Sequence, residues 1–246
     1  MLHYDKPLTN DKIFRKIRQN SIKENKVTNY LKYAVGEIVL VVIGILIAIS
    51  LNNWNEAQKL NKWEHRFLTD LKSELKTNLE QLEQINNQHL LVGKACIELK
   101  SLLKTATIKD KSRIDSLYTL TLYQSTFFPT TGVYDSGLSA GKIENIRNDK
   151  LKYDIMNVYN HYYKRLVYNG EILDGVIGNI DLHRDEYFDR TNMKLKSWGY
   201  IKSPEFLLKI DYLNGRNIEY TFLTEENVKV IKRLIRSISD YLGENN

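Results

Sequence analysis

The feature that most constrains this chain is an apolar run of eighteen residues, from Ala34 to Leu51, whose single charged residue is Glu37. A helix rises about 1.5 Å per residue, so the run would span roughly 27 Å, which is close to the thickness of the hydrocarbon layer of a bilayer. We therefore predict a transmembrane helix over residues 33–53. A buried core helix is the alternative, but nothing else in the chain is apolar enough to enclose one.

Basic residues are concentrated before this run. Residues 1–32 contain eight Lys and Arg against three Asp and Glu, which accounts for +5 of the net charge of +6. Because cytoplasmic flanks of membrane helices carry an excess of Lys and Arg, we predict a cytoplasmic segment 1–32 and an extracytoplasmic domain 54–246. The basic segment is too long for a cleaved signal peptide, so we expect an uncleaved signal anchor. The nearly neutral remainder argues against nucleic acid as a partner.

Three residues inside the run lie on one side of the expected helix: Glu37, Gly44 and Ala48. Gly44 and Ala48 form a small-x-x-x-small pattern, which lets two membrane helices approach closely. We expect this stripe to pack against another helix, through self-association or with a protein partner in the membrane. For Glu37, the alternatives are ion or proton chemistry and simple pairing with Lys32 or lipid headgroups.

Two stretches resemble a known family. FRKIRQ (residues 14–19), followed by YLKYAVGEIVLVVIGILIAISLNNWNE (residues 30–56), is similar to the N-terminal signature of an uncharacterised bacterial family, a membrane-anchored domain of unknown function. YDSGLSAGKIENIRNDKL (residues 134–151) looks like a second, less specific block of that family. The resemblance implies a place in the bacterial inner membrane with a periplasmic C-terminal domain, and it assigns no activity.

From Glu56 to Lys104 the sequence contains no Pro and one Gly, and it is rich in Leu, Glu, Lys and Gln, which predicts one long helix. Apolar residues recur along it at alternating spacings of three and four, as in coiled coils and helical bundles. The seam consists of Leu68, Leu71, Leu75, Asn78, Leu82, Ile85, His89, Val92, Cys96, Leu99 and Leu103. The additional residues Leu79, Leu90, Leu91 and Ile97 widen this stripe and favour a bundle. Asn78 and His89 are expected to set the register or to be satisfied core groups.

The remaining segments predict an all-α domain. Helices are expected over residues 113–125, with Ser112 as cap, and from Asn148 or Asp149 to about Phe188. A short helix capped by Ser203 should end before Gly215, and a last helix should begin at Thr224. Gly170, Gly175 and Gly178 indicate a kink or a close helix contact, and Trp198-Gly199 a loop. No segment shows sustained strand alternation.

The sequence contains little that indicates catalysis. It has no Gly-rich phosphate loop, no nucleophile elbow and no zinc-protease motif. The metal candidates are His183 and Glu186, with the distant His161 or His89 as further ligands, but the mixed charges of this stretch are more typical of a solvated helix face. We therefore expect no catalytic residue, no cofactor and no metal. A set of tyrosines could line a ligand pocket but is more typical of bundle core: Tyr153, Tyr159, Tyr162, Tyr163 and Tyr168.

Together these patterns predict a single-pass membrane protein whose helical domain binds a protein partner or a small ligand, as a non-catalytic scaffold or sensor. A metal-dependent envelope enzyme that uses the His183 and Glu186 region is the alternative. The lone Cys96 lies on the seam, where a parallel coiled-coil dimer would place two thiols opposite each other. We favour an intramolecular bundle, in which Cys96 is a buried and inert side chain.

Overall fold

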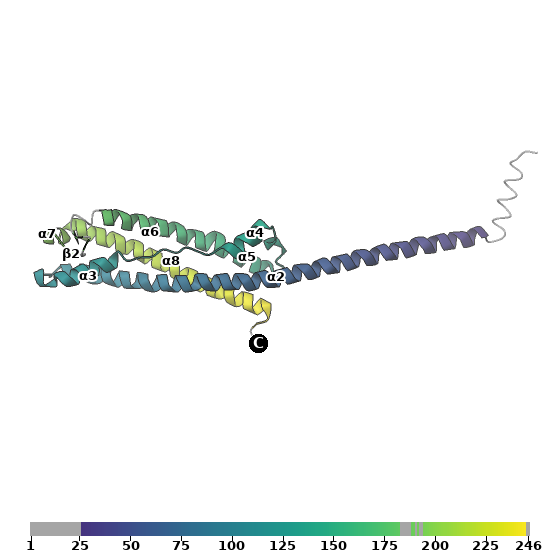
Figure 1. Cartoon of the computed structure of the whole chain (residues 1–246), viewed down its shortest axis with the longest axis horizontal. Helices are drawn as coiled ribbons and strands as arrows, with labels where there is room; N and C mark the ends of the chain where they lie inside the picture. Colours follow the sequence, from purple (N-terminus) through teal and green to yellow (C-terminus); the bar gives the residue numbers. More distant parts are fainter. Residues whose placement is uncertain (1–25, 183–187, 190, 192–193, 245–246) are drawn as a thin grey trace, which may run out of the picture. The chain divides into compact units, whose positions relative to one another are not determined.

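The computed structural model describes residues 26–182, 188–189, 191 and 194–244. Within these residues the chain is almost entirely helical, as the sequence predicts (Figure 1). The chain divides into two compact units, residues 1–61 and 62–246. The first described helix, α2 (Lys26–Leu103), contributes residues to both units.

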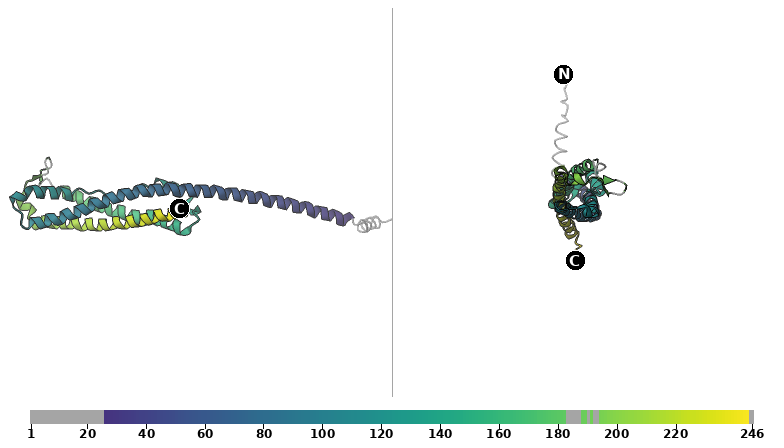
Figure 2. Two further views of the ribbon diagram at one scale, coloured as in Figure 1. Left: turned by 90° about the horizontal axis from the view of Figure 1, so that it is seen from below. Right: turned by 90° about the vertical axis from the view of Figure 1, so that its left-hand side faces the viewer.

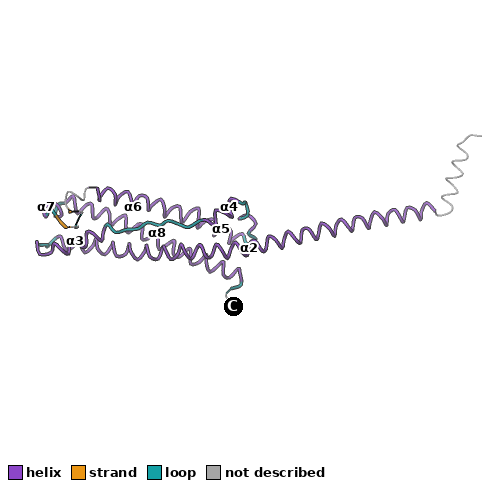
Figure 3. Tube along the Cα trace, viewed as in Figure 1, coloured by secondary structure: helices purple, strands orange, loops and turns teal. Residues whose placement is uncertain are grey.

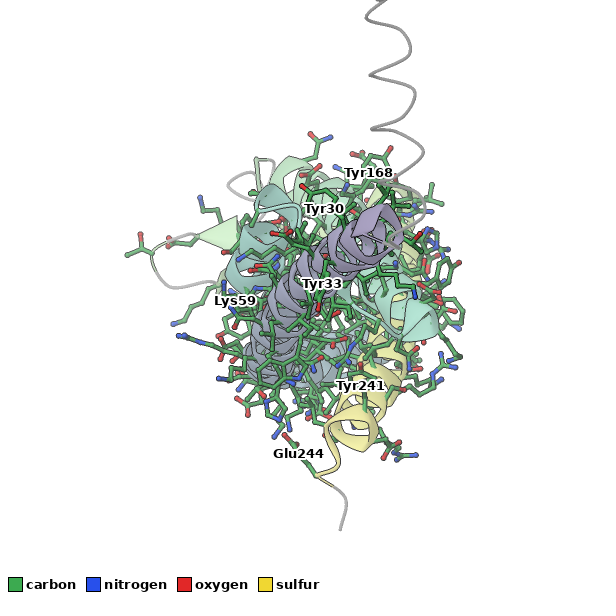
Figure 4. All side chains as sticks on the ribbon, turned by 90° about the vertical axis from the view of Figure 1, so that its right-hand side faces the viewer. Tyr30, Tyr33, Lys59, Tyr168, Tyr241 and Glu244 are labelled. Atoms are coloured by element: carbon green, nitrogen blue, oxygen red, sulfur yellow. The ribbon has the colours of Figure 1, made fainter. Side chains whose placement is uncertain are left out.

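In the first unit, α2 exposes the apolar run. No side chain from Ala34 to Leu51 is buried. Tyr30 and Tyr33, which are labelled in Figure 4, and Trp54 are exposed as well. By length and composition, α2 is the one helix among the described residues that is long and apolar enough to cross a membrane.

In the second unit, the later part of α2 lies beside three other helices along a common axis (Figures 1 and 2). These helices are α3 (Lys111–Thr121), α6 (Lys164–Leu182) and α8 (Pro204–Leu242). The shorter helices are α4 (Gly132–Ser139), α5 (Asp149–Asn157), α7 (Trp198–Ile201) and the π-helix η3 (Val158–Tyr163). Two 3-10 turns, η1 (Ile108–Asp110) and η2 (Ile143–Asn145), and two antiparallel strands, β1 (Phe188–Asp189) and β2 (Lys194–Leu195), complete the described elements.

The seam of α2 forms the centre of the core. All eleven predicted seam residues, from Leu68 to Leu103, are buried, so this prediction is confirmed. The nine that are apolar divide between two clusters of buried side chains. One cluster joins Leu75 to Leu166 of α6 and Ile231 of α8. The other surrounds Cys96, and in it the rings of Tyr118 and Phe188 stack with their centroids 4.1 Å apart.

The helix α8 is continuous where the sequence predicted two helices. Its start is as expected, because the Ser203 hydroxyl accepts a hydrogen bond from the Phe206 amide and Pro204 follows the cap. Gly215, however, lies inside the helix, and the Thr224 hydroxyl donates to the Tyr220 carbonyl instead of capping a new helix. A glycine costs about 1 kcal/mol in a helix interior, which burial of apolar residues on both sides of it offsets.

The helix expected from residue 149 to Phe188 is divided. The cap is correct, since the Asn148 side chain accepts a hydrogen bond from the Leu151 amide. The π-helix η3 then separates α5 from α6, and Phe188 belongs to a strand. Of the three glycines in α6, Gly170 alone makes a close contact: an added Cβ would lie 3.1 Å from the Cβ of Thr126.

Three smaller expectations are wrong. The first short helix begins at Lys111 and ends at Thr121, so Ser112 lies inside it. The expected loop at Trp198 is the short helix α7, which the Ser197 hydroxyl caps. The wide apolar stripe on α2 is mostly exposed: Leu79 is partly buried, whereas Leu90, Leu91 and Ile97 are on the surface.

Burial of Cys96 makes a specific prediction about its reactivity. Desolvation raises the pKa of this thiol to about 12, and the negative charge of Asp211 makes a smaller contribution in the same direction. Because the thiolate is the reactive species, the native full-length chain in mild detergent should react with thiol reagents at pH 8 at least ~100-fold more slowly than the urea-unfolded chain. Unreduced protein should migrate as a monomer. A disulfide dimer that disappears in Cys96→Ser would contradict this and favour a parallel coiled coil.

Candidate functional site

An extended piece of chain crosses the helical bundle between α3 and α4. Residues 122–131, which we call the connecting segment, form no helix or strand and run alongside the helices (Figure 3). Backbone groups buried without a partner are costly, so such a segment needs hydrogen bonds from elsewhere. Buried side chains of α2 and α8 supply several of them.

The Asn78 side chain bonds the connecting segment as a neighbouring strand would. Its Oδ1 accepts from the amide of Thr130 at 2.8 Å, and its Nδ2 donates to the carbonyl of Thr130 at 2.8 Å. Farther along, the hydroxyl of Tyr220 on α8 accepts from the amide of Phe127 at 2.8 Å. The prediction that Asn78 is a satisfied core group is therefore confirmed.

His89 lies fully buried between α8 and the connecting segment. Its Nδ1 is 2.7 Å from Oδ1 of Asn217, and its Nε2 is 2.8 Å from the carbonyl of Ser125. The amide group of Asn217 donates in turn to the His89 carbonyl at 3.0 Å, which fixes the orientation of that amide. Both ring nitrogens thus face oxygen atoms of the protein at hydrogen-bond distance, which leaves neither of them open to a ligand.

Two buried glutamates of α2 continue this pattern beyond the connecting segment. Oε2 of Glu74 accepts from the amide of Val133 in the first turn of α4, at 2.6 Å. Oε1 of Glu64 accepts from the amide of Arg147 at 2.9 Å, and Oε2 of Glu64 accepts from the Arg147 guanidinium at 2.9 Å. Hydrogen bonding to Glu64, followed by its negative charge, raises the pKa of Arg147. Tyr241 of α8 also donates to Glu64, at 2.9 Å.

A pocket of about 440 Å³ opens beside the connecting segment, between α4, η3 and the start of α6. Its inner wall includes the buried rings of Tyr134, Tyr159 and Tyr163. Tyr134 and Tyr159 stack with centroids 4.1 Å apart, and Tyr159 and Tyr163 meet edge to face at 5.0 Å. The rim carries Asn160, Lys164, Tyr168 and Glu171. We call this site the tyrosine pocket.

The π-helix positions the aromatic wall. A π-helix has a wider turn than an α-helix, and single π turns are frequently found at functional sites. In η3 both buried tyrosines reach polar side chains of α2: the Tyr159 hydroxyl donates to Oε1 of Glu74 at 2.7 Å, and the Tyr163 hydroxyl accepts from Nδ2 of Asn78 at 3.2 Å. Burial raises the pKa of both tyrosines, so they stay neutral.

The composition of the tyrosine pocket suits binding more than bond making or breaking. Aromatic faces accept a flat or apolar group, and the polar rim can orient it. Inside the wall, each carboxylate oxygen of Glu74 already accepts a hydrogen bond from the protein. Of the five tyrosines that the sequence singled out, Tyr159 and Tyr163 are core, Tyr162 is half-buried, and Tyr153 and Tyr168 are exposed.

Where the structure describes them, the other candidates from the sequence are not brought together. His183 and Glu186 lie outside the described residues. His161 is exposed on η3, and no three His, Cys, Asp or Glu side chains of the described ranges are grouped so that they could hold a metal. In the first unit, Glu37, Gly44 and Ala48 are exposed on α2, and an added Cβ on Gly44 would meet nothing within 4 Å.

Sequence reasoning missed the two buried glutamates. A signal for Glu64 was present. When the seam is continued toward the N-terminus, its next position is four residues before Leu68, which is Glu64. A carboxylate at a seam position indicates a buried partner. Glu74 gives no such signal, because it is one residue before the seam position Leu75, and a glutamate there is typical of a solvent-facing position.

The architecture is that of an α-helical protein with one strongly apolar helix and a helical domain that contains an aromatic pocket. The model of a family of unknown function, DUF6090, matches residues 37–216, and the chain belongs to this family. The resemblance to an uncharacterised family is therefore confirmed. Searches of curated proteins and of solved structures found no match to the chain.

The bond between Tyr159 and Glu74 gives a stability prediction. Tyr159→Phe leaves a buried carboxylate oxygen without its donor, which should lower the free energy of unfolding by about 1–3 kcal/mol. The matched control is Tyr168→Phe, because Tyr168 of α6, labelled in Figure 4, is 63% exposed; this change should cost less than about 0.5 kcal/mol. Denaturant unfolding of the full-length chain in mild detergent measures both. Equal effects of the two substitutions would contradict the role given to Tyr159.

Proposed function

We propose that the protein is a single-pass protein of the bacterial inner membrane, with residues 1–32 in the cytoplasm, a signal anchor over 33–53 and its helical domain in the periplasm. There it acts as a non-catalytic scaffold or sensor that binds a small ligand or a protein partner. The tyrosine pocket is the binding site that we assign to this role.

The exposed apolar run carries the membrane part of the proposal. Leaving the apolar side chains of Ala34–Leu51 in water is unfavourable. Full burial of one large aliphatic side chain would lower the free energy by about 1.5–3 kcal/mol. A bilayer would remove this cost. The excess of basic residues in 1–32 supports the proposed orientation.

The buried polar groups support a binding role over a catalytic one. A catalytic acid, base or metal ligand needs an atom that can reach a substrate or an ion. In Glu64, Glu74 and His89, the oxygen and nitrogen atoms of the side chains already have protein partners. These residues hold the fold, and the aromatic wall remains as the recognition surface.

The alternative is an envelope enzyme that uses a metal at His183 and Glu186. Metal analysis of the purified full-length chain separates the two proposals. A stoichiometric transition metal that is lost in His183→Ala, but retained in a control such as His65→Ala at an exposed position of α2, would overturn the non-catalytic role.

The topology is tested by proteolysis of spheroplasts. A protease added from outside should digest the domain after Trp54 and leave an N-terminal tag protected, because the basic segment is held inside. The same protease should remove the tag only after the membrane is permeabilised. A protected domain with an accessible N-terminal tag would refute the orientation.

The membrane stripe is tested by a matched pair of substitutions. Gly44→Ile removes the close approach of a second helix and should weaken association several-fold in a two-helix reporter assay in membranes. Gly36→Ile makes the same change about 80° away from Gly44 around the helix and should have little effect. If both substitutions leave association unchanged, the stripe formed by Glu37, Gly44 and Ala48 does not mediate helix packing.

A further inference from the structure

A second, differently charged pocket lies between α5, η3 and α8. It has a volume of about 380 Å³, and its floor includes the buried side chains of Val158 and Leu234. Three cationic side chains line it: Lys150 of α5, and Arg233 and Arg236 of α8. We call it the basic pocket. It shares no lining residue with the tyrosine pocket.

Among the described residues, neither arginine forms an ion pair. Lys150 pairs with Asp154, the one carboxylate in the lining, at 3.1 Å. Arg233 and Arg236, in contrast, make no hydrogen bond or ion pair with any part of the chain that the structure describes. They are three residues apart on one face of α8, where like charges repel. An anion between them would remove that repulsion.

The geometry and the donors of the basic pocket select a class of anion. A guanidinium group presents a planar fork that bonds two oxygens of a phosphate at once, and two such groups can hold one phosphate from two sides. Hydroxyl groups of Tyr162 and Ser237 in the same lining can donate to further oxygens. The volume leaves room for a small organic group beyond the phosphate.

We propose that the basic pocket binds a phosphate ester, carried either by a small soluble molecule or by a lipid headgroup. Arg233 and Arg236 hold the phosphate oxygens, and the apolar floor contacts the organic part. The site is separate from the tyrosine pocket and does not depend on the function assigned to that pocket.

Calorimetric titration of the full-length chain in a neutral detergent tests this proposal. The two probes are glycerol 3-phosphate, as a soluble ester, and a short-chain phosphatidic acid, as a headgroup ester. At least one should bind, and the double substitution Arg233→Gln/Arg236→Gln should weaken that binding at least ~10-fold. Both arginines are exposed, so circular dichroism and the melting temperature should be unchanged.

A charge-matched control separates this site from general attraction. Lys104→Gln/Lys109→Gln removes the same two charges near α3, at the opposite end of the bundle from α5 (Figure 1), and should leave binding within about twofold. If either ester binds and the binding is lost only in the arginine variant, the proposal is supported. The ester that binds then shows whether the phosphate belongs to a soluble molecule or to a lipid headgroup. No binding of either probe, or equal loss in the two variants, overturns it.

Discussion

The helical domain depends on hydrogen bonds between helices and the extended connecting segment, which has no strand beside it. An extended segment that packs along a bundle of helices has no neighbouring strand, because the backbone groups of a helix are hydrogen-bonded within that helix. The long helix resolves this with buried side chains in place of a strand. Asn78 bonds both the amide and the carbonyl of Thr130, and Glu74 and His89 bond the chain on either side of it. The buried positions of α2 that bond this part of the chain are therefore polar, although their neighbours on the seam are apolar.

The same polar side chains connect the core to the tyrosine pocket. The hydroxyls of Tyr159 and Tyr163 contact Glu74 and Asn78, while parts of the same tyrosines line the cavity. The wall of the pocket is thus held by the groups that hold the connecting segment. Rigid aromatic walls reduce the entropy lost when a ligand binds, which suits a site for recognition.

Periodicity was enough to predict the helical class and the whole buried seam of α2, because those residues share one repeating spacing. It failed where a local signal competes with tertiary packing. Gly215 and Thr224 have the composition of a helix boundary, yet α8 continues through both because its buried face is uninterrupted. The tyrosine pocket could be predicted only as a set of residues. Its shape depends on η3, whose wide turn leaves no pattern in the sequence, and on the partners of Glu74, which are distant along the chain.

The bonds from α2 end on backbone atoms of Ser125, Thr130, Val133 and Arg147, and every amino acid carries a backbone carbonyl and all but proline an amide. The side chains of α2 and the residues whose backbone they bond are consequently under unequal constraint during evolution. At Ser125 and Thr130, which are exposed, the side chain can change freely so long as proline does not replace the amide donor of Thr130. On α2, Asn78 has no isosteric substitute that both donates and accepts. Sequence drift between relatives should accordingly be fast on one side of the contact and slow on the other.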